Sequence, residues 1–265
     1  MNLIFKIFEY TILALPQKVR WRLLRGGFSE YAYCLLLKPR RLNLPKLSLE
    51  VLLPDYRDAP VTLSRLPKGD WASPVVDVVV MAKLVRTLQP QTVLELGSFR
   101  GFTALAMAQN MPESSRLVAV DMEPKHGEAY SDRPESSIIE RRTGEIERKL
   151  FRENEFGTFD LVFIDADHRY EAVKHDTEIA LQLLKPDGWI VWHDYANWGY
   201  FSGACGVPEY LAEFKKTHSV AQILGSNMAV HRPCWDDSAQ AEFEDALAHT
   251  ESLRGGVWSV GVPRV

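Results

Sequence analysis

The chain has 265 residues, of which 46% are hydrophobic and 25% are charged, as is usual for a soluble globular protein. This length is enough for one α/β domain with additions or for two small domains. The net charge of the whole chain, −4, does not indicate a nucleic-acid partner, and we expect no such partner. The three cysteines lie far apart, which excludes a disulfide scaffold and a CxxC zinc site and favours a reducing compartment, the cytoplasm.

The N-terminal segment is basic. Residues 1–46 contain nine Lys or Arg residues and two acids, Glu9 and Glu30, a net charge of +7 (nine minus two). The apolar start is interrupted by Lys6 and is shorter than the roughly 20 residues of a membrane-spanning helix, and it lacks a signal-peptide pattern. We expect residues 1–70 to form a helical basic extension. Two interpretations remain open: a solvated or core-facing layer, or a contact surface for the periphery of a membrane or for a second copy of the chain.

The pattern changes at Trp71, where strands and helices begin to alternate. Ser73 and Pro74 resemble the N-cap and first residue of a helix that runs to about Leu88. Short apolar runs predict strands at 92–96, 116–121, 137–142, 160–166 and 188–194. Helices are expected at about 101–110, 145–153 and 171–184. This alternation predicts a parallel sheet with right-handed crossovers.

The pattern after the last of these strands is different. A helix is expected at 207–217, followed by strands at 220–225 and 227–232 that are separated by little more than a tight turn. We therefore predict a Rossmann-like α/β fold for residues 71–234, with a seven-stranded, mostly parallel sheet and a C-terminal antiparallel hairpin. Residues 235–265 are expected to add one acidic helix and a tail.

A glycine-containing turn follows the first predicted strand. Gly97 has no Cβ, so a ligand can approach the backbone at the carboxyl end of this strand, and Gly101 lets the next helix begin close to it. The spacing is G-x-x-x-G and not the G-x-G-x-x-G of dinucleotide sites, which disfavours an NAD-dependent oxidoreductase. Asp121 ends the next strand, 24 residues after Gly97, where it can accept hydrogen bonds from ribose hydroxyls. These features favour a nucleoside-type ligand over ordinary helix–strand packing.

The segment ELGSFRGFT, Glu95 to Thr103, resembles motif I of class I S-adenosylmethionine-dependent methyltransferases. The resemblance covers roughly residues 71–233. It implies that the glycine turn contacts the methionine part of S-adenosylmethionine, that Asp121 holds the ribose, and that the turn after the third strand borders the adenine. The cofactor-binding residues that we predict on this basis are Glu95, Gly97, Ser98, Phe99, Gly101, Thr103, Asp121, Met122, Thr143, Gly144 and Asp165.

A second group of polar residues follows the fourth and fifth predicted strands. Asp165 and Asp167 come at or just past the end of the fourth strand, and His193 and Asp194 end the fifth. Adjacent parallel strands deliver these side chains to the same edge of the sheet as the glycine turn. Two carboxylates and an imidazole are a reasonable set of ligands for a divalent cation. Helix capping and strand-end charge networks are the alternative interpretation.

The segments FIDADHRYEAVKHD and KPDGWIVWHDY resemble the branch that contains macrocin-type sugar O-methyltransferases, cephalosporin-hydroxylase-like proteins and, by spacing, catechol O-methyltransferase. The resemblance implies a magnesium ion held by Asp165, His193 and Asp194, although the catechol enzyme has an acid where this chain has His193. It also implies catalytic roles for Asp165 and for His168, whose imidazole can accept a hydroxyl proton near neutral pH. A structural histidine that bonds the loop backbone is the alternative for His168.

These observations predict an S-adenosylmethionine-dependent methyltransferase that acts, with a divalent metal, on a hydroxyl of a small molecule of sugar, phenolic or polyketide type. The sequence does not fix the acceptor. Two alternatives remain: a metal-free methyltransferase of the same fold, and a non-catalytic or membrane-surface binding protein that retains the fold. Aromatic residues after the fifth strand are candidates for the acceptor pocket, with core packing as the alternative: Tyr195, Trp198, Tyr200 and Phe201.

Overall fold

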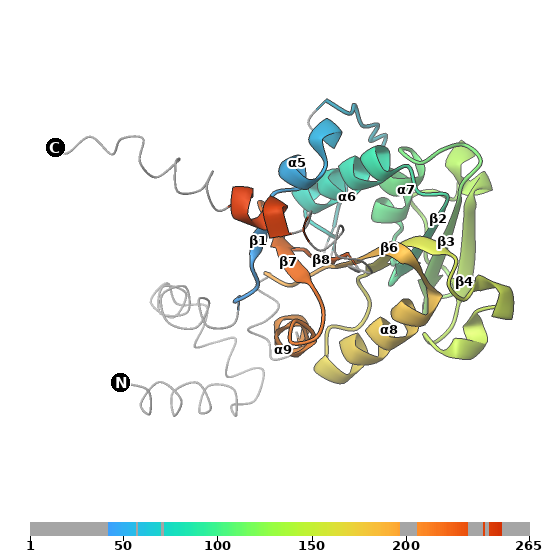
Figure 1. The fold of residues 1–265 in the computed structure, drawn as a ribbon. Helices are drawn as coiled ribbons and strands as arrows, with labels where there is room; N and C mark the ends of the chain where they lie inside the picture. The colour runs from blue at the N-terminus through green and yellow to red at the C-terminus, as the bar shows by residue number, and fades with distance from the viewer. Residues whose placement is uncertain are drawn as a thin grey trace, which may run out of the picture.

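The computed structural model describes residues 42–56, 58–69, 72–196, 206–232, 241 and 244–250. They form a mixed sheet of eight strands with helices on both faces (Figure 1). The strand order is β1-β7-β8-β6-β5-β2-β3-β4. The strands are β1 (Lys46–Leu47), β2 (Thr92–Leu96), β3 (Arg116–Asp121), β4 (Ile139–Thr143), β5 (Phe159–Ile164), β6 (Leu184–Trp192), β7 (Val220–Ile223) and β8 (Ala229–His231). The labelled α-helices are α5 (Leu49–Leu52), α6 (Val75–Leu88), α7 (Phe102–Ala108), α8 (Tyr170–Leu183) and α9 (Val207–Phe214), and residues 244–250 are also helical.

Among the described strands, only β8 runs against the others. It pairs antiparallel with β6 and with β7, and every other neighbouring pair is parallel. The Rossmann-like sheet with a closing antiparallel strand is therefore confirmed. Two details differ from the prediction. The connection from Ile223 to Ala229 is longer than the tight turn that we expected, and β1 adds an eighth strand by pairing with β7, with Leu47 opposite Ile223.

Successive side chains of each strand point to opposite faces of the sheet, which produces two hydrophobic cores, one on each face. In β2, for example, Val93 faces the layer of α5, α6 and α7, whereas Leu94 and Leu96 face the layer of α8 and α9. Both faces are covered by helices, so the central strands read as continuous apolar runs in the sequence. Among the described residues, no helix is both long enough and apolar enough to cross a membrane.

Short 3₁₀ turns replace one predicted helix. The sequence predicts an α-helix at 145–153, but the structure has separate turns at Arg148–Leu150 and Glu153–Glu155. Phe151 and Arg152 between them are extended, with ψ angles of 145° and 149°, which interrupts the helical hydrogen bonds. The connection between Asp121 and β4 is also without an α-helix and holds only a 3₁₀ turn at Pro134–Ser137. The second helix expected for a doubly wound fold is thus absent from this described stretch.

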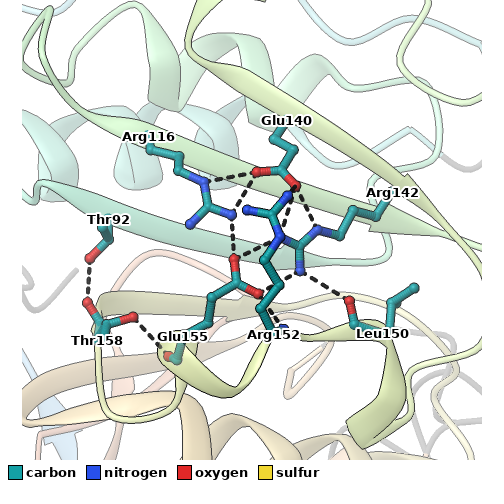
Figure 2. A network of polar contacts seen from close by, with 8 residues as sticks. All are labelled: Thr92, Arg116, Glu140, Arg142, Leu150, Arg152, Glu155 and Thr158. Carbon is teal, nitrogen blue, oxygen red and sulfur yellow. Dashed lines mark hydrogen bonds and ion pairs between the residues drawn. The ribbon is translucent and has the colours of Figure 1, made fainter.

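A network of arginine and glutamate side chains holds the segment 148–155 against β3 and β4 (Figure 2). Arg142 binds Glu140 at 2.8 Å and Glu155 at 2.6 Å. Arg116 binds both acids as well, 2.6 Å from Glu140. Glu155 also accepts the backbone N–H of Arg152 at 2.8 Å. Burial opposes the charge of Glu155, but the two guanidinium groups outweigh it and lower the pKa of Glu155 to about 2.

We expect Glu155→Gln to lower the free energy of unfolding by about 3 kcal/mol at neutral pH, because it removes the more buried of the two carboxylates that neutralise Arg116 and Arg142 and leaves only Glu140 for both. The folded pKa of Glu155 lies below its ordinary value of 4.5, so this stabilisation is complete above about pH 4.5. It is lost as the pH falls toward 2. Urea unfolding of both proteins across this range checks the prediction, and their difference should shrink on acidification.

Glu153→Gln is the matched control. Glu153 lies in the same 3₁₀ turn, but its side chain is 84% exposed and that of Glu155 is 4% exposed. The exposed pair that Glu153 forms with Arg148 should contribute less than about 1 kcal/mol. Equal losses for the two variants would show that the network does not stabilise this segment.

Candidate functional site

The turn after β2 lies directly against the turn after β5. Gly97 has a φ angle of 90°, and a Cβ there would overlap the carbonyl group of Asp165 and the Cα atom of Ala166. The N–H groups of Gly97 and Ser98 both donate to the carbonyl of Val120 on β3, at 2.9 and 3.0 Å, which bends the chain away from the sheet. Glycine is therefore required at position 97, and the two predicted groups of site residues are brought into contact here.

Three buried polar atoms near this turn make no hydrogen bond of good geometry, although Ser98 lies close enough to influence both other residues: Glu95 Oε2, Ser98 Oγ and the Tyr130 hydroxyl. Burial raises the pKa of Glu95 to about 8 and that of Tyr130 to about 12. Unpaired buried polar groups are costly, so groups of this kind mark a place where a polar ligand can complete the hydrogen bonding. An ammonium or carboxylate group such as those of S-adenosylmethionine fits this requirement.

Tyr130 was not predicted from the sequence. It lies in the irregular connection after β3, and its ring packs against Gly101 and Gly127, where a Cβ on either glycine would overlap it. Both glycines have positive φ angles, 79° and 85°. Gly127 is the one local signal for this packing, and it does not point to a particular aromatic partner.

Asp121 is positioned by backbone donors at the end of β3. Its carboxylate accepts the N–H of Phe99 at 2.6 Å and that of Glu123 at 2.8 Å. Phe99 is held at a φ angle of 45°, a left-handed conformation that costs a non-glycine residue of order 1–3 kcal/mol and occurs at functional sites. Its side chain is 45% exposed and that of Met122 is 70% exposed. Two exposed apolar side chains beside Asp121 are suited to an apolar ring.

The remaining predicted cofactor residues lie at the same edge. Thr143 is the strand partner of Asp121, and Gly144 N donates to the Asp121 carbonyl at 3.0 Å. The residues predicted for ribose and adenine are therefore adjacent. Thr103 is buried in the first turn of α7, two residues after the Gly101 N-cap.

The acids and histidines converge where β5 and β6 end. Asp165, His168 and Asp194 each offer one ligand atom, and these atoms lie within 4.8 Å of one another. His168 Nε2 is 3.3 Å from Asp165 and 3.1 Å from Asp194. Asp194 adopts a φ angle of 58°, the second strained non-glycine residue at this edge. The described chain thus contains an acidic and imidazole cluster of the kind that holds a divalent cation.

His193 lies behind this cluster and is buried. Its Nδ1 atom is 3.1 Å from Asp165 Oδ1 and 3.0 Å from Asp194 Oδ1. The predicted ligand set of Asp165, His193 and Asp194 is therefore brought together, and His168 joins it from the other side. Which imidazole binds a cation and which accepts a proton stays a prediction.

In this cluster the interactions with charged neighbours together outweigh the effect of burial on each pKa. Burial alone would raise the pKa of Asp165, but the His193 and His168 imidazoles hold it at about 2. Burial alone would lower the pKa of His168, but the carboxylates of Asp165 and Asp194 raise it. The pKa of His193 is raised in the same way, well above 6.5. Each acid is thus favoured as a carboxylate, the state that binds a cation.

Asp77 is a second residue that was not predicted for the site. It is buried in the first turn of α6, and it accepts a hydrogen bond from His193 Nε2 at 3.0 Å. The helix begins later than predicted, because Pro74 is the N-cap and Ser73 lies outside it. Ser73 Oγ donates instead to Asp165 at 3.4 Å. The start of α6 therefore supports the cluster.

The aromatic residues predicted to line an acceptor pocket are only partly described. Tyr195 is fully buried, and its hydroxyl accepts the N–H of Leu44 at 2.9 Å. It therefore belongs to the core, and the pocket interpretation is wrong for it. Trp198, Tyr200 and Phe201 lie outside the described residues, as do residues 1–41 of the basic extension.

Comparisons with known proteins agree with this geometry. Residues 94–195 match a family described as a methyltransferase domain. Catechol O-methyltransferase domain-containing protein 1 of Mus musculus is 31% identical over 138 residues, which are 46% of this chain and 48% of the mouse protein. The chain thus matches about half the length of that relative. Caffeoyl-CoA O-methyltransferase of Stellaria longipes is 27% identical over 177 residues, covering 59% of this chain and 70% of the plant protein.

Among solved structures, the O-methyltransferase TomG of Streptomyces achromogenes, solved in complex with SAM, has a TM-score of 0.51 and 19% identity. The match covers 78% of this chain and 96% of that chain, and it shows a shared fold. Residues 94–195 thus match a methyltransferase domain, and the relatives that the chain resembles include catechol and caffeoyl-CoA O-methyltransferases, in agreement with the resemblance seen in the sequence.

Proposed function

We propose that the chain transfers the methyl group of S-adenosylmethionine to a hydroxyl of a small molecule with the help of a divalent cation. The observation that carries the proposal is the contact between two sites. The glycine turn at Gly97, with its unpaired polar atoms, lies against Asp165, which belongs to the acid and histidine cluster. A cofactor at the first site and an acceptor hydroxyl at the second would be neighbours.

The cofactor supplies an activated methyl group when bound, and a divalent cation, when bound, lowers the pKa of the acceptor hydroxyl. The chain contributes positioning, which is where most of the rate enhancement of such a transfer lies. Asp121 and the turn residues Ser98 and Phe99 would orient the nucleoside. Asp165 and Asp194 would hold the cation, together with an imidazole of the cluster.

His168 is our candidate for the group that accepts the hydroxyl proton. Its Nε2 atom lies between Asp165 and Asp194, and the side chain is about one-third exposed, so an acceptor can reach it. His193, at 5% exposure, is much less accessible. This difference favours His168 as the base and His193 as the ligand.

We expect His168→Ala to lower turnover by about 10²–10⁴-fold, the usual contribution of a positioned base, while the affinity for S-adenosylhomocysteine changes less than about twofold. Steady-state kinetics and calorimetry check this. His175→Ala is the control, because His175 is an exposed histidine of α8 whose ring bonds the carbonyl of Ile146. Equal losses in turnover and cofactor affinity would contradict the role of His168 as a base.

The acceptor is proposed to be phenolic, or otherwise a sugar or polyketide hydroxyl. The names of the two relatives above, which refer to catechol and caffeoyl-CoA, support a phenolic acceptor. The test is transfer of a labelled methyl group to catechol as the probe, with metal-stripped protein and with Mg²⁺ restored. Activity that needs the cation supports the proposal.

Unchanged activity after metal removal would favour the metal-free methyltransferase instead. Absence of both transfer and cofactor binding would favour a binding protein that retains the fold. A contact of the basic segment 1–46 with a membrane surface or a second copy of the chain is a separate proposal, since most of that segment lies outside the described residues.

A further inference from the structure

A buried carboxylate connects three elements behind the proposed cation site. Asp77, in the first turn of α6, is 1% exposed. Its Oδ2 atom accepts from His193 Nε2 at 3.0 Å and from Asn227 Nδ2 at 3.1 Å, and its Oδ1 atom accepts from the Asn227 backbone N–H at 3.0 Å. The carboxylate is thus held from two sides, by the end of β6 and by the connection before β8.

The other ring nitrogen of His193 faces the site. Nδ1 is buried and makes no hydrogen bond of good geometry, although it lies 3.1 Å from Asp165 Oδ1 and 3.0 Å from Asp194 Oδ1. The ring also packs edge-on against Phe163, with 6.2 Å between centroids and 71° between planes. Rotation of the ring would break the bond to Asp77, so the direction of Nδ1 is fixed.

The spacing of Nδ1 from the two carboxylates is compatible with coordination of one ion by all three residues. Donors that bind a small divalent cation at about 2.1 Å in octahedral geometry lie about 3 Å apart along each edge. The two distances from Nδ1 to the carboxylates have this value. A carboxylate that receives the second N–H of a metal-binding histidine is also the usual partner that fixes the tautomer of such a ligand.

We infer that Asp77 is a positioning residue that holds His193 through Nε2 and directs Nδ1 between Asp165 and Asp194, where a bound cation would take the place of the Nδ1 proton, so that the site contains a nitrogen donor and prefers a transition-metal ion to Mg²⁺. Imidazole ligands suit ions such as Co²⁺, whereas Mg²⁺ prefers oxygen ligands only. The inference deepens the cation site of the proposed function and rests on it. The role of Asp77 and the preference for ions that bind nitrogen go beyond that proposed function.

The test measures binding of the metals themselves. Co²⁺ and Mg²⁺ are titrated by calorimetry into the metal-stripped full chain, and the visible spectrum of bound Co²⁺ reports its ligands. We expect the wild-type protein to bind Co²⁺ at least about tenfold more tightly than Mg²⁺. Asp77→Asn should weaken Co²⁺ binding by about 10–100-fold, the usual effect of losing such a partner, and change the Co²⁺ spectrum.

Two controls separate positioning from general damage. Asp176→Asn removes another buried acid, on α8, to which neither histidine is hydrogen-bonded, and it should leave the preference for Co²⁺ intact. His193→Ala should reduce the preference for Co²⁺ over Mg²⁺ at least as much as Asp77→Asn does. If Asp77→Asn does not fold, Asn227→Ala tests the same support from the other side and should weaken Co²⁺ binding by about tenfold or less.

Wild-type affinity for Mg²⁺ equal to or above that for Co²⁺ would overturn the inference. So would an Asp77→Asn protein with the wild-type Co²⁺ affinity and spectrum. S-adenosylhomocysteine binding is measured in the same samples, because it distinguishes the two proposals. If neither metal binds but the cofactor product does, the cation site fails while a metal-free methyltransferase stands.

Discussion

Replacement of Asp165 by Asn is expected to lower kcat/KM by on the order of 10²–10³-fold, since the proposed cation would supply several kcal/mol of charge stabilisation at this position. Asp165 Oδ1 lies 3.1 Å from His193 Nδ1 and 3.3 Å from His168 Nε2, so a single carboxylate oxygen contacts both imidazoles of the cluster. An amide of the same shape keeps the packing but removes the negative charge. Methyl transfer is measured at saturating divalent cation, and folding is checked by thermal unfolding.

The neighbouring acid provides the control for this variant. Asp167 lies two residues away, but its carboxylate binds the side chain and backbone N–H of Arg169 at the surface. Asp167→Asn should therefore retain turnover within about twofold of the wild-type value. A comparable loss in both variants, or full activity of Asp165→Asn, would show that the cluster does not take part in the reaction.

Replacement of Gly97 by Ala is expected to affect both stability and the cofactor site. The added methyl group would overlap the backbone of Asp165 and Ala166, and the φ angle of 90° is unfavourable for alanine. We expect the free energy of unfolding to fall by about 2–4 kcal/mol, the sum of overpacking and backbone strain. Separation of the two turns should weaken S-adenosylhomocysteine binding by on the order of 10²-fold.

Gly157→Ala separates these two causes. Gly157 also has a positive φ angle, 71°, but nothing lies within 4 Å of the position of an added Cβ. This variant should lose only the strain component, about 1–2 kcal/mol, and keep its affinity for the cofactor product. If Gly97→Ala resembles Gly157→Ala in both measurements, the contact between the two turns is not needed for cofactor binding.

The parts of this fold that correspond to a local pattern in the sequence could be predicted. The buried strands β2, β3 and β5 are apolar runs, and the turn at Gly97 shows in the spacing of two glycines. By contrast, β1 consists of two residues, Lys46 and Leu47, and forms only because β7 offers an edge about 176 residues away. No periodicity over two residues can reveal such a strand.

The residues of the site could likewise be predicted only where a local sequence pattern marks them. Asp165, His193 and Asp194 were predictable because they end consecutive strands of one sheet. Asp77 carries no such signal, since an acid in the first turn of a helix ordinarily interacts with the helix dipole. Its partners, His193 and Asn227, are 116 and 150 residues away in the chain. Tyr130 is similar, because only the folded connection after β3 brings it beside Gly101.

The central claim is that the edge of the sheet beside Gly97 binds S-adenosylmethionine. Calorimetric titration of S-adenosylhomocysteine into the wild-type chain tests it most directly, with Asp121→Ala as the comparison. We predict saturable one-to-one binding by the wild-type protein and binding at least about tenfold weaker in the variant, because a charged hydrogen-bond acceptor is lost. Absence of binding by the wild-type chain, or equal affinity of the two proteins, would contradict the account.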